Sequence, residues 1–357
     1  MSILTNMMKS QFQSYSGKAK LFKKIGALLR NNWQVVDIFE YLVGKHDSGG
    51  DIGRHMNPEY HFLKNALDVM SRAGTLPDAF EGWVSATELV IIKTGEKTGA
   101  YEQALQQCID LDTEVSTIIK TVKKSLITPV FALVILVGLL VGAKSSMMPI
   151  LEDLVPMNRW PDIALSFYDI STAVGENPSQ TFGIMFGIAF FIKWSTPNLV
   201  IPAVPKFRNF LDKVFMPYSI YKAMQISIFL KSLSSLLVAG VRFRDALELI
   251  EHSSNKYMKV HVSEMLKKVT QAENSATVFE SEFLGHYGED LSAMARGDNL
   301  EGALNDVATD CMKEVTEDLP AKMGFIGTLC MVSIIGVVIF GLLAFYEIVG
   351  ILQSGDI

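Results

Sequence analysis

The densest group of side chains with metal-binding chemistry lies between residues 46 and 61. Imidazole and carboxylate groups are common metal ligands in proteins. Gly49 and Gly50 interrupt the group, and such a glycine-rich polar stretch is typical of a solvated loop. We therefore expect a polar loop here and no metal site. The residues concerned are His46, Asp47, Asp51, His55, Glu59 and His61.

A second stretch, Thr94-Gly95-Glu96-Lys97-Thr98-Gly99, has the composition of a phosphate-binding loop. In a phosphate loop glycine directly precedes the lysine, and a four-residue spacer and a strand come before it. Here Glu96 precedes Lys97, and neither the spacer nor a strand is indicated. No nucleophile and base form a recognisable catalytic pattern elsewhere. The sequence therefore predicts no enzyme activity, no catalytic residue and no cofactor.

Net charge and cysteine usage exclude further classes of protein. The net charge of -6 provides no basic field for nucleic acid. Cys108, Cys311 and Cys330 are far apart, match no zinc spacing and leave one cysteine out of any pairing. A reducing compartment fits this usage. The N-terminal residues carry several lysines and no apolar core, so no signal peptide is expected.

Three stretches are apolar enough to cross a bilayer, which needs about 20 such residues. Basic residues flank the first span on its N-terminal side and the second span on its C-terminal side, whereas the segment between them is acidic. By the positive-inside rule the N-terminus is cytoplasmic and the C-terminus periplasmic. The predicted segments are a cytoplasmic helical domain at 1–124, transmembrane helices at 125–148, 180–202 and 324–346, a periplasmic loop at 149–179, a second cytoplasmic domain at 203–323 and a periplasmic tail at 347–357.

The two cytoplasmic segments resemble each other. Residues 28–42 align without a gap over 236–250, and two shorter blocks follow in the same order, Ala79-Phe80-Glu81 over Val278-Phe279-Glu280 and Tyr101–Leu105 over Leu300–Leu304. Conserved order across three blocks indicates duplication of a domain and its following span. Apolar residues recur at intervals of three and four, which predicts helices, about six in each copy, and no sheet. The predicted fold is all-α, with two homologous six-helix bundles and three transmembrane helices.

Several residues are predicted to begin or end these helices. Asn57-Pro58 offers a cap with proline in the first turn, and Ser85 with Glu88 fits a capping box, as does Asp298 with Glu301. Gly74, Gly95 and Gly240 suit helix ends, where glycine adopts left-handed conformations readily. On this basis Gly95 ends one helix and Glu96 begins the next, where its carboxylate meets the positive end of the helix dipole.

The segment Ile92-Lys93-Thr94-Gly95-Glu96-Lys97-Thr98-Gly99-Ala100-Tyr101-Glu102-Gln103-Ala104-Leu105 resembles the Gly-Glu-x-Ser/Thr-Gly turn of the type II secretion F domain. The second copy keeps only a decayed form around Asp298. With the duplication and the spans, the chain resembles the inner-membrane platform proteins of type IV pili and type II secretion, and its short length is similar to the type IVb pilus branch. The resemblance implies a hexameric assembly ATPase, pilin and minor pilins, alignment proteins and homo-oligomerisation as partners.

The role of the turn and the contacts made by the glycines of the spans stay open. Gly95, Glu96, Gly99 and Asp298 form either a partner-binding surface or a capped interhelical turn. Gly138 with Gly142 and Gly183 with Gly187 have the spacing of close helix contact, within or between subunits. Lys144 and Lys193 lie near span ends, where long side chains reach the interface. The alternative function is a small oligomeric transporter or channel component.

Overall fold

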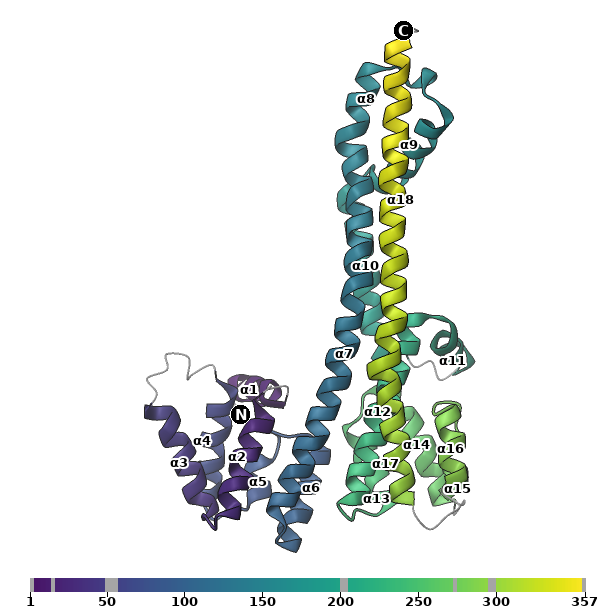
Figure 1. Cartoon of the computed structure of the whole chain (residues 1–357). Coiled ribbons are helices and arrows are strands. Elements are labelled where there is room, and N and C mark those ends of the chain that lie inside the picture. Colours follow the sequence, from purple (N-terminus) through teal and green to yellow (C-terminus); the bar gives the residue numbers. More distant parts are fainter. Residues whose placement is uncertain are drawn as a thin grey trace. The chain divides into compact units, whose positions relative to one another are not determined.

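The computed structural model describes residues 3–13, 17–48, 57–199, 205–271, 275–294 and 300–354. These ranges are helical and contain no strand, so the all-α prediction is confirmed (Figure 1). The chain divides into two compact units. Unit 1 contains Met1–Ile119 and Val200–Lys313, and unit 2 contains Lys120–Leu199 and Glu314–Ile357.

Unit 1 contains both copies of the predicted duplication. The first repeat consists of α1 (Ile3–Gln13), α2 (Lys18–Arg30), α3 (Val35–Ser48), α4 (Pro58–Ser71), α5 (Leu76–Phe80), α6 (Ala86–Thr98) and the beginning of α7 (Tyr101–Gly142). The second repeat consists of α11 (Pro205–Val214), α12 (Met216–Val238), α13 (Phe243–Ser253), α14 (Lys256–Thr270), α15 (Ser275–Phe279), α16 (His286–Met294) and α17 (Leu300–Lys313).

Aligned positions of the two repeats adopt the same backbone conformation. Asn32, with φ 58°, aligns with Gly240, with φ 81°, and each residue follows the end of a helix. The next amide then bonds back in the same way, from Trp33 N to Leu28 O at 3.3 Å and from Val241 N to Leu236 O at 3.0 Å. Glycine takes this left-handed conformation at little cost and asparagine tolerates it, which explains the two residue types.

Helix starts follow the predicted chemistry where they are described. The Asn57 side chain accepts a hydrogen bond from Glu59 N, with Pro58 in the first turn of α4. Ser85 and Glu88 form a reciprocal capping box at the start of α6. Asp298 lies outside the described residues, so its predicted capping box stays a prediction.

One hydrophobic core runs through both repeats. Its centre in the first repeat is aromatic: the Phe62 ring lies 4.5 Å from Phe12, 5.0 Å from Phe80 and 5.7 Å from Trp83. Burial of each such side chain contributes roughly 1.5–3 kcal/mol. In the second repeat Phe229, Leu233 and Phe279 occupy the same continuous core. The repeats are therefore packed as one body and share apolar surface.

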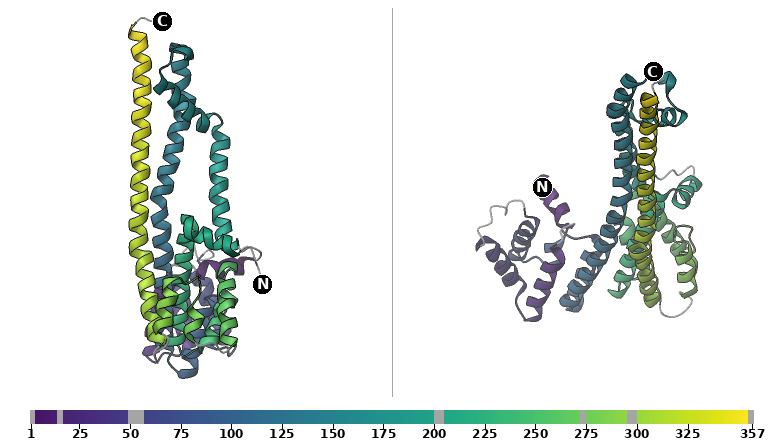
Figure 2. Two further views of the ribbon diagram at one scale, coloured as in Figure 1. Left: turned by 90° about the vertical axis from the view of Figure 1, so that its right-hand side faces the viewer. Right: turned by 45° about the horizontal axis from the view of Figure 1, so that its top comes forward.

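Unit 2 contains the apolar helices. After Ile119, α7 continues to Gly142 and is followed by η2 (Ala143–Met147), a π-helical turn, and α8 (Met148–Leu154). The remaining elements are η3 (Met157–Arg159), α9 (Asp162–Gly175), α10 (Pro178–Asn198), η4 (Glu314–Asp318) and α18 (Leu319–Ser354). Figure 2 shows α18 as one uninterrupted helix.

Two helical stretches of the described chain, Tyr101–Leu154 and Gly302–Gln353, are long and apolar enough to cross a membrane. Only 17% and 11% of their most apolar segments are buried within the chain, so most of these side chains face outward. The second predicted span coincides with α10, which is not one of these two stretches. Polar residues such as Gln180, Lys193 and Asn198 lower its average hydropathy. The third crossing therefore stays a prediction.

The segment predicted as a loop at 149–179 is largely helical. Its α9 packs on α18, and Trp160 and Phe167 belong to a small core with Ala344 and Ile348. The Trp160 indole donates to Val155 O at 2.8 Å, which fixes the turn before α9. The sequence showed that this segment is acidic. Charge counting does not reveal helical periodicity, so the packing of this segment was not predicted.

Candidate functional site: a buried ion cluster beside the junction of the repeats

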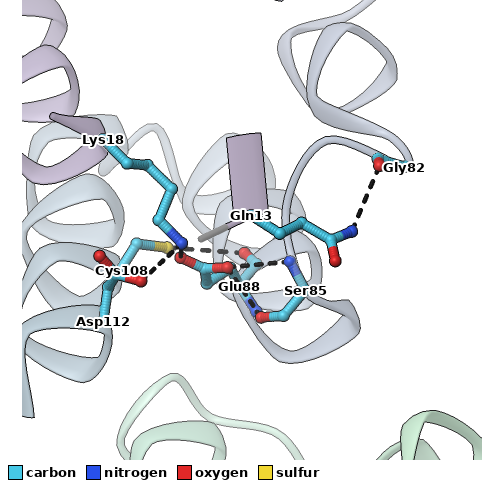
Figure 3. Close-up of polar contacts among 7 residues, drawn as sticks. All are labelled: Gln13, Lys18, Gly82, Ser85, Glu88, Cys108 and Asp112. Atoms are coloured by element: carbon cyan, nitrogen blue, oxygen red, sulfur yellow. Dashed lines mark hydrogen bonds and ion pairs between the residues drawn. The ribbon is translucent and has the colours of Figure 1, made fainter. Parts of the chain in front are cut away.

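A buried lysine begins α2. Leu21, Phe22 and Ile25 form the buried face of this helix, and Lys18 lies on the same face one turn earlier. Its side chain is 3% exposed, and its Nζ lies 2.8 Å from Glu88 Oε1 and 2.6 Å from Asp112 Oδ1 (Figure 3). An isolated buried cation is strongly unfavourable, so this lysine depends on the two carboxylates.

Glu88 uses its two carboxylate oxygens for different tasks. Oε1 faces Lys18, while Oε2 accepts hydrogen bonds from Ser85 N at 2.9 Å and Ser85 Oγ at 2.8 Å. Ser85 Oγ in turn accepts from Glu88 N at 3.3 Å. The Cys108 thiol donates to the backbone oxygen of Glu88 at 3.6 Å. The carboxylate is therefore held by the start of α6 and joins it to Lys18 on α2. Contact with α7 is made by the Glu88 backbone through Cys108 and by Lys18 through Asp112.

The electrostatics of the cluster favour a charged lysine. Burial lowers the pKa of Lys18, but the carboxylates of Glu88 and Asp112 outweigh burial and raise the pKa above its ordinary value. Burial also raises the pKa of the neighbouring Cys108 thiol, which is therefore a neutral packing group and a poor nucleophile. A protonated amine between two acids with an unreactive thiol provides ion pairing and no catalytic nucleophile.

The cluster opens onto a cavity of about 430 Å³ at the junction of the two repeats. The first repeat lines it with Lys18, Glu88 and Asp112, and the second repeat contributes polar groups that include Gln225 and Asn255. The Asn255 amide donates to Gln225 Oε1 at 3.1 Å and to the Tyr221 hydroxyl at 3.0 Å. Both walls of the cavity therefore carry polar groups held by hydrogen bonds or ion pairs, among apolar side chains such as Leu111 and Phe229.

A second ion pair joins the repeats at the side of this cavity. Lys231 on α12 lies 2.8 Å from Glu114 on α7, and both side chains are largely buried. Since α7 leads from the first repeat into the apolar segment, this pair connects the second repeat to that helix. Partly buried pairs of this kind are screened by solvent less than pairs on an open surface.

The second repeat has no counterpart of the ion cluster. The ungapped alignments place Ile226 over Lys18, Tyr287 over Glu88 and Cys311 over Asp112, and all three second-repeat side chains are buried. The same helical scaffold therefore folds with uncharged residues at these three positions. The charges of the first repeat are a local specialisation that the fold itself does not require.

The turn at Gly95–Gly99 differs from the prediction. The helix ends at Gly99, which has φ +73°, and Gly95 lies inside α6. A Cβ on Gly95 would lie 2.4 Å from the Ala104 Cβ, so close packing with α7 requires glycine there. Glu96 lies in the last turn of α6 and not at a helix start, so its predicted favourable interaction with the helix dipole is wrong.

The turn still presents polar groups to solvent. Lys97, Thr98 and Gly99 are exposed, and Glu96 is partly exposed beside Tyr101. Burial, followed by the nearby Glu96 carboxylate, raises the pKa of the Tyr101 hydroxyl. The structure thus places three of the four predicted partner-binding residues, Gly95, Glu96 and Gly99, at one turn; Asp298 lies outside the described residues.

The glycines proposed for helix packing have open surroundings. A Cβ on Gly138, Gly142, Gly183 or Gly187 would meet no atom of this chain within 4 Å. Contact within the subunit is therefore not found at these positions, and contact between subunits stays a prediction. Close approach in unit 2 occurs elsewhere: a Cβ on Gly327 would lie 2.9 Å from Thr128.

Of the two lysines near the span ends, Lys144 places its Nζ 3.9 Å from the centre of the Tyr168 ring, an arrangement that binds a cation. Lys193 is exposed on α10.

The polar group at 46–61 is only partly described. His46 Nε2 lies 3.3 Å from Glu59 Oε1, and the Tyr60 hydroxyl donates to Asp47 Oδ1 at 3.3 Å. The described part of the chain contains no group of three or more His, Cys, Asp or Glu residues arranged to hold a metal ion. Asp51 and His55 lie outside the described residues.

Sequence reasoning missed Lys18 and Asp112. The sequence did contain a signal for Lys18. This lysine lies one turn before Leu21 and Phe22 on the same apolar stripe of a helix. If that stripe is buried, the lysine needs an acidic partner. Asp112 lies more than ninety residues away on another helix, and local patterns do not bring the two together.

The described fold and site define an all-α protein with two helical repeats, long apolar helices and a buried structural ion cluster. Residues 229–347 match the family described as type II secretion system (T2SS), protein F. The resemblance to this family predicted from the sequence is thereby confirmed. The chain is also 21% identical over 252 residues to the toxin coregulated pilus biosynthesis protein E of Vibrio cholerae serotype O1. That alignment covers 70% of this chain and 71% of the relative.

Proposed function

We propose that this chain is an inner-membrane platform protein of a type IV pilus or type II secretion machine, which couples a cytoplasmic assembly ATPase to pilin polymerisation. The family match and the pilus biosynthesis relative support this proposal. Two apolar helices support a place in the inner membrane. On this proposal both repeats lie in the cytoplasm, 149–179 and the C-terminus lie in the periplasm, and α10 is the third span.

The observation that carries the proposal is the continuity of two helices. Leu105 and Cys108 of α7 are buried in the core of the first repeat, and the same helix continues to Gly142 through the apolar segment. Leu304 and Cys311 of α17 are buried in the second repeat, and helical structure continues through η4 into α18. A helix cannot be extended without breaking its hydrogen bonds, so a force on either repeat reaches the apolar segment.

Because the two repeats share one hydrophobic core, we expect them to move together. They pack as one body, and the Lys231–Glu114 ion pair links α12 to α7. On this proposal the Lys18 cluster holds α2, α6 and α7 in one arrangement. The Gly95–Gly99 turn at the end of α6 contacts the ATPase. Pilins, minor pilins and alignment proteins are then partners of the apolar and periplasmic segments.

Co-purification from native membranes tests the proposal. The full tagged chain should retain an assembly ATPase and pilin after gentle solubilisation. Glu96→Lys should reduce ATPase recovery while leaving the level of membrane-inserted chain unchanged, because a cation is favourable in the last turn of a helix. Glu40→Lys, an exposed charge reversal on α3, is the matched control. Retention of neither partner by the unaltered chain would contradict the proposal.

A further inference from the structure

The helix α11 at the start of the second repeat has an inverted polarity. Two of its charged residues, Arg208 and Asp212, are 5% exposed, whereas Phe207, Phe210 and Val214 are 46%, 58% and 65% exposed. A surface helix normally turns its apolar stripe toward the protein core and its charges toward water. The residues that α11 turns outward therefore require an apolar environment outside this chain.

Specific contacts hold the charged side of α11 against the second repeat. Arg208 Nε lies 3.0 Å from Asp212 Oδ1, and the Tyr257 hydroxyl donates to Asp212 Oδ2 at 2.9 Å. The Arg208 guanidinium lies 4.7 Å from the Tyr218 ring centre and 4.4 Å from the Tyr257 ring centre. Two aromatic faces and a carboxylate thus surround the buried cation.

Residues on the flank of α11 also contact the second repeat. The Asn209 amide donates to Glu282 Oε2 at 2.6 Å, and Lys213 Nζ lies 2.9 Å from Glu282 Oε1. These contacts come from one side of the helix, so the helix cannot rotate to bury its aromatic residues without breaking them. The outward orientation of Phe207 and Phe210 is fixed by the inward contacts.

The first repeat provides an internal comparison. Its leading helix α1 buries Met8 and Phe12, at 2% and 0% exposure, against the aromatic core. The leading helix of the second repeat, α11, turns Arg208 and Asp212 inward. The apolar outer face is therefore a property of α11 and not of the leading helix in general.

We propose that α11 lies in the membrane interface, with Phe207, Phe210 and Val214 among the acyl chains at the headgroup boundary. The apolar face continues beyond the helix through Phe215 and Met216, which are 49% and 43% exposed. Such helices insert to a depth of about 5–10 Å.

Chain connectivity favours lipid over a protein partner. Only six residues, 199–204, separate α11 from α10, so α11 begins within about 25 Å of the end of that predicted span. The proposal rests on the membrane placement of the apolar helices and not on coupling to an ATPase.

Depth measurement on the full chain in nanodiscs tests this proposal. A single cysteine replaces Phe210 in a Cys330→Ser background, in which the remaining thiols of Cys108 and Cys311 are buried, and it is labelled with the NBD fluorophore. Phe210→Cys should show blue-shifted emission that is quenched more by lipids with a nitroxide near the headgroup than by lipids with one at the chain end. Val260→Cys on α14, another exposed apolar site, is the control and should stay unquenched.

Three results would overturn the proposal. A label at residue 210 that emits and quenches like the label at residue 260 would place α11 in water. Quenching that is equal at all nitroxide depths would exclude an interfacial position. A blue shift without lipid quenching, lost when nanodiscs with single chains are selected, would assign the apolar face to a second copy of the chain.

Discussion

Replacing Lys18 with methionine should loosen the junction of α2, α6 and α7. The change keeps much of the side-chain volume but leaves the Glu88 carboxylate, 3% exposed, without its cation. Removing one partner of a buried ion pair costs about 3–5 kcal/mol. Asp112 is 25% exposed and can regain water, so the cost arises chiefly at Glu88.

The thiol of Cys108 measures this loss directly. It is fully buried beside Glu88, so alkylation of the full chain requires local opening. A loss of about 3–5 kcal/mol corresponds to a roughly 100- to 4,000-fold faster alkylation of Cys108. Peptide mass spectrometry separates this site from the other two cysteines. Lys23→Met, on the exposed side of the same helix, is the control and should leave the rate unchanged.

A double-mutant cycle distinguishes the ion pair from simple packing. Glu88→Gln preserves the capping box with Ser85 and removes the buried charge. In the Lys18→Met background this second change should return the alkylation rate to within about tenfold of the original. A Lys18→Met protein that reacts at the unaltered rate, or a double variant that reacts as fast as the single one, would refute the assignment of an energetically coupled pair.

Three further outcomes are expected. Burial and nearby cations lower the pKa of His261 to about 4 from 6.5, so the unfolded chain takes up a proton first as the pH falls. Thermal stability should therefore decline as the pH falls from 6.5 to 4, and His261→Phe should flatten that decline; an unchanged slope would contradict the assignment. Gly95→Ala should lower the unfolding free energy by about 1–3 kcal/mol through overpacking, and Ala104→Gly should restore most of it in denaturant titrations. In intact cells a cysteine at Asp169 should react with an impermeant thiol reagent and one at Ser254 should not; labelling at Ser254 would overturn the proposed topology.

Local patterns were sufficient to predict the helices and their repetition. Leu28–Leu42 aligned over Leu236–Ile250 without knowledge of the backbone, and the left-handed residues Asn32 and Gly240 fall at equivalent positions. The Ser85 capping box followed from spacing alone because cap chemistry depends on residues within one helical turn.

Interactions between distant residues set the limit of prediction. Gly95 was assigned to a helix end because glycine is common there, but its role comes from contact with Ala104 on the next helix. The Lys18 cluster and the Arg208–Asp212 pair depend on side chains brought together by tertiary packing. The inverted face of α11 was visible in the spacing of Phe207 and Val214, yet only the fold showed which face was inward.

Interrupting α7 tests whether force or position passes from the repeats to the membrane through continuous helices. A flexible Gly-Gly-Ser-Gly insertion at Lys120, where α7 passes from unit 1 to unit 2, should abolish pilus assembly in a strain that lacks the native chain. Co-purification of the ATPase should persist, and a helical insertion of seven alanine-rich residues, which keeps the helix continuous and nearly in phase, should retain more assembly. Normal assembly with the flexible insertion would contradict the claim.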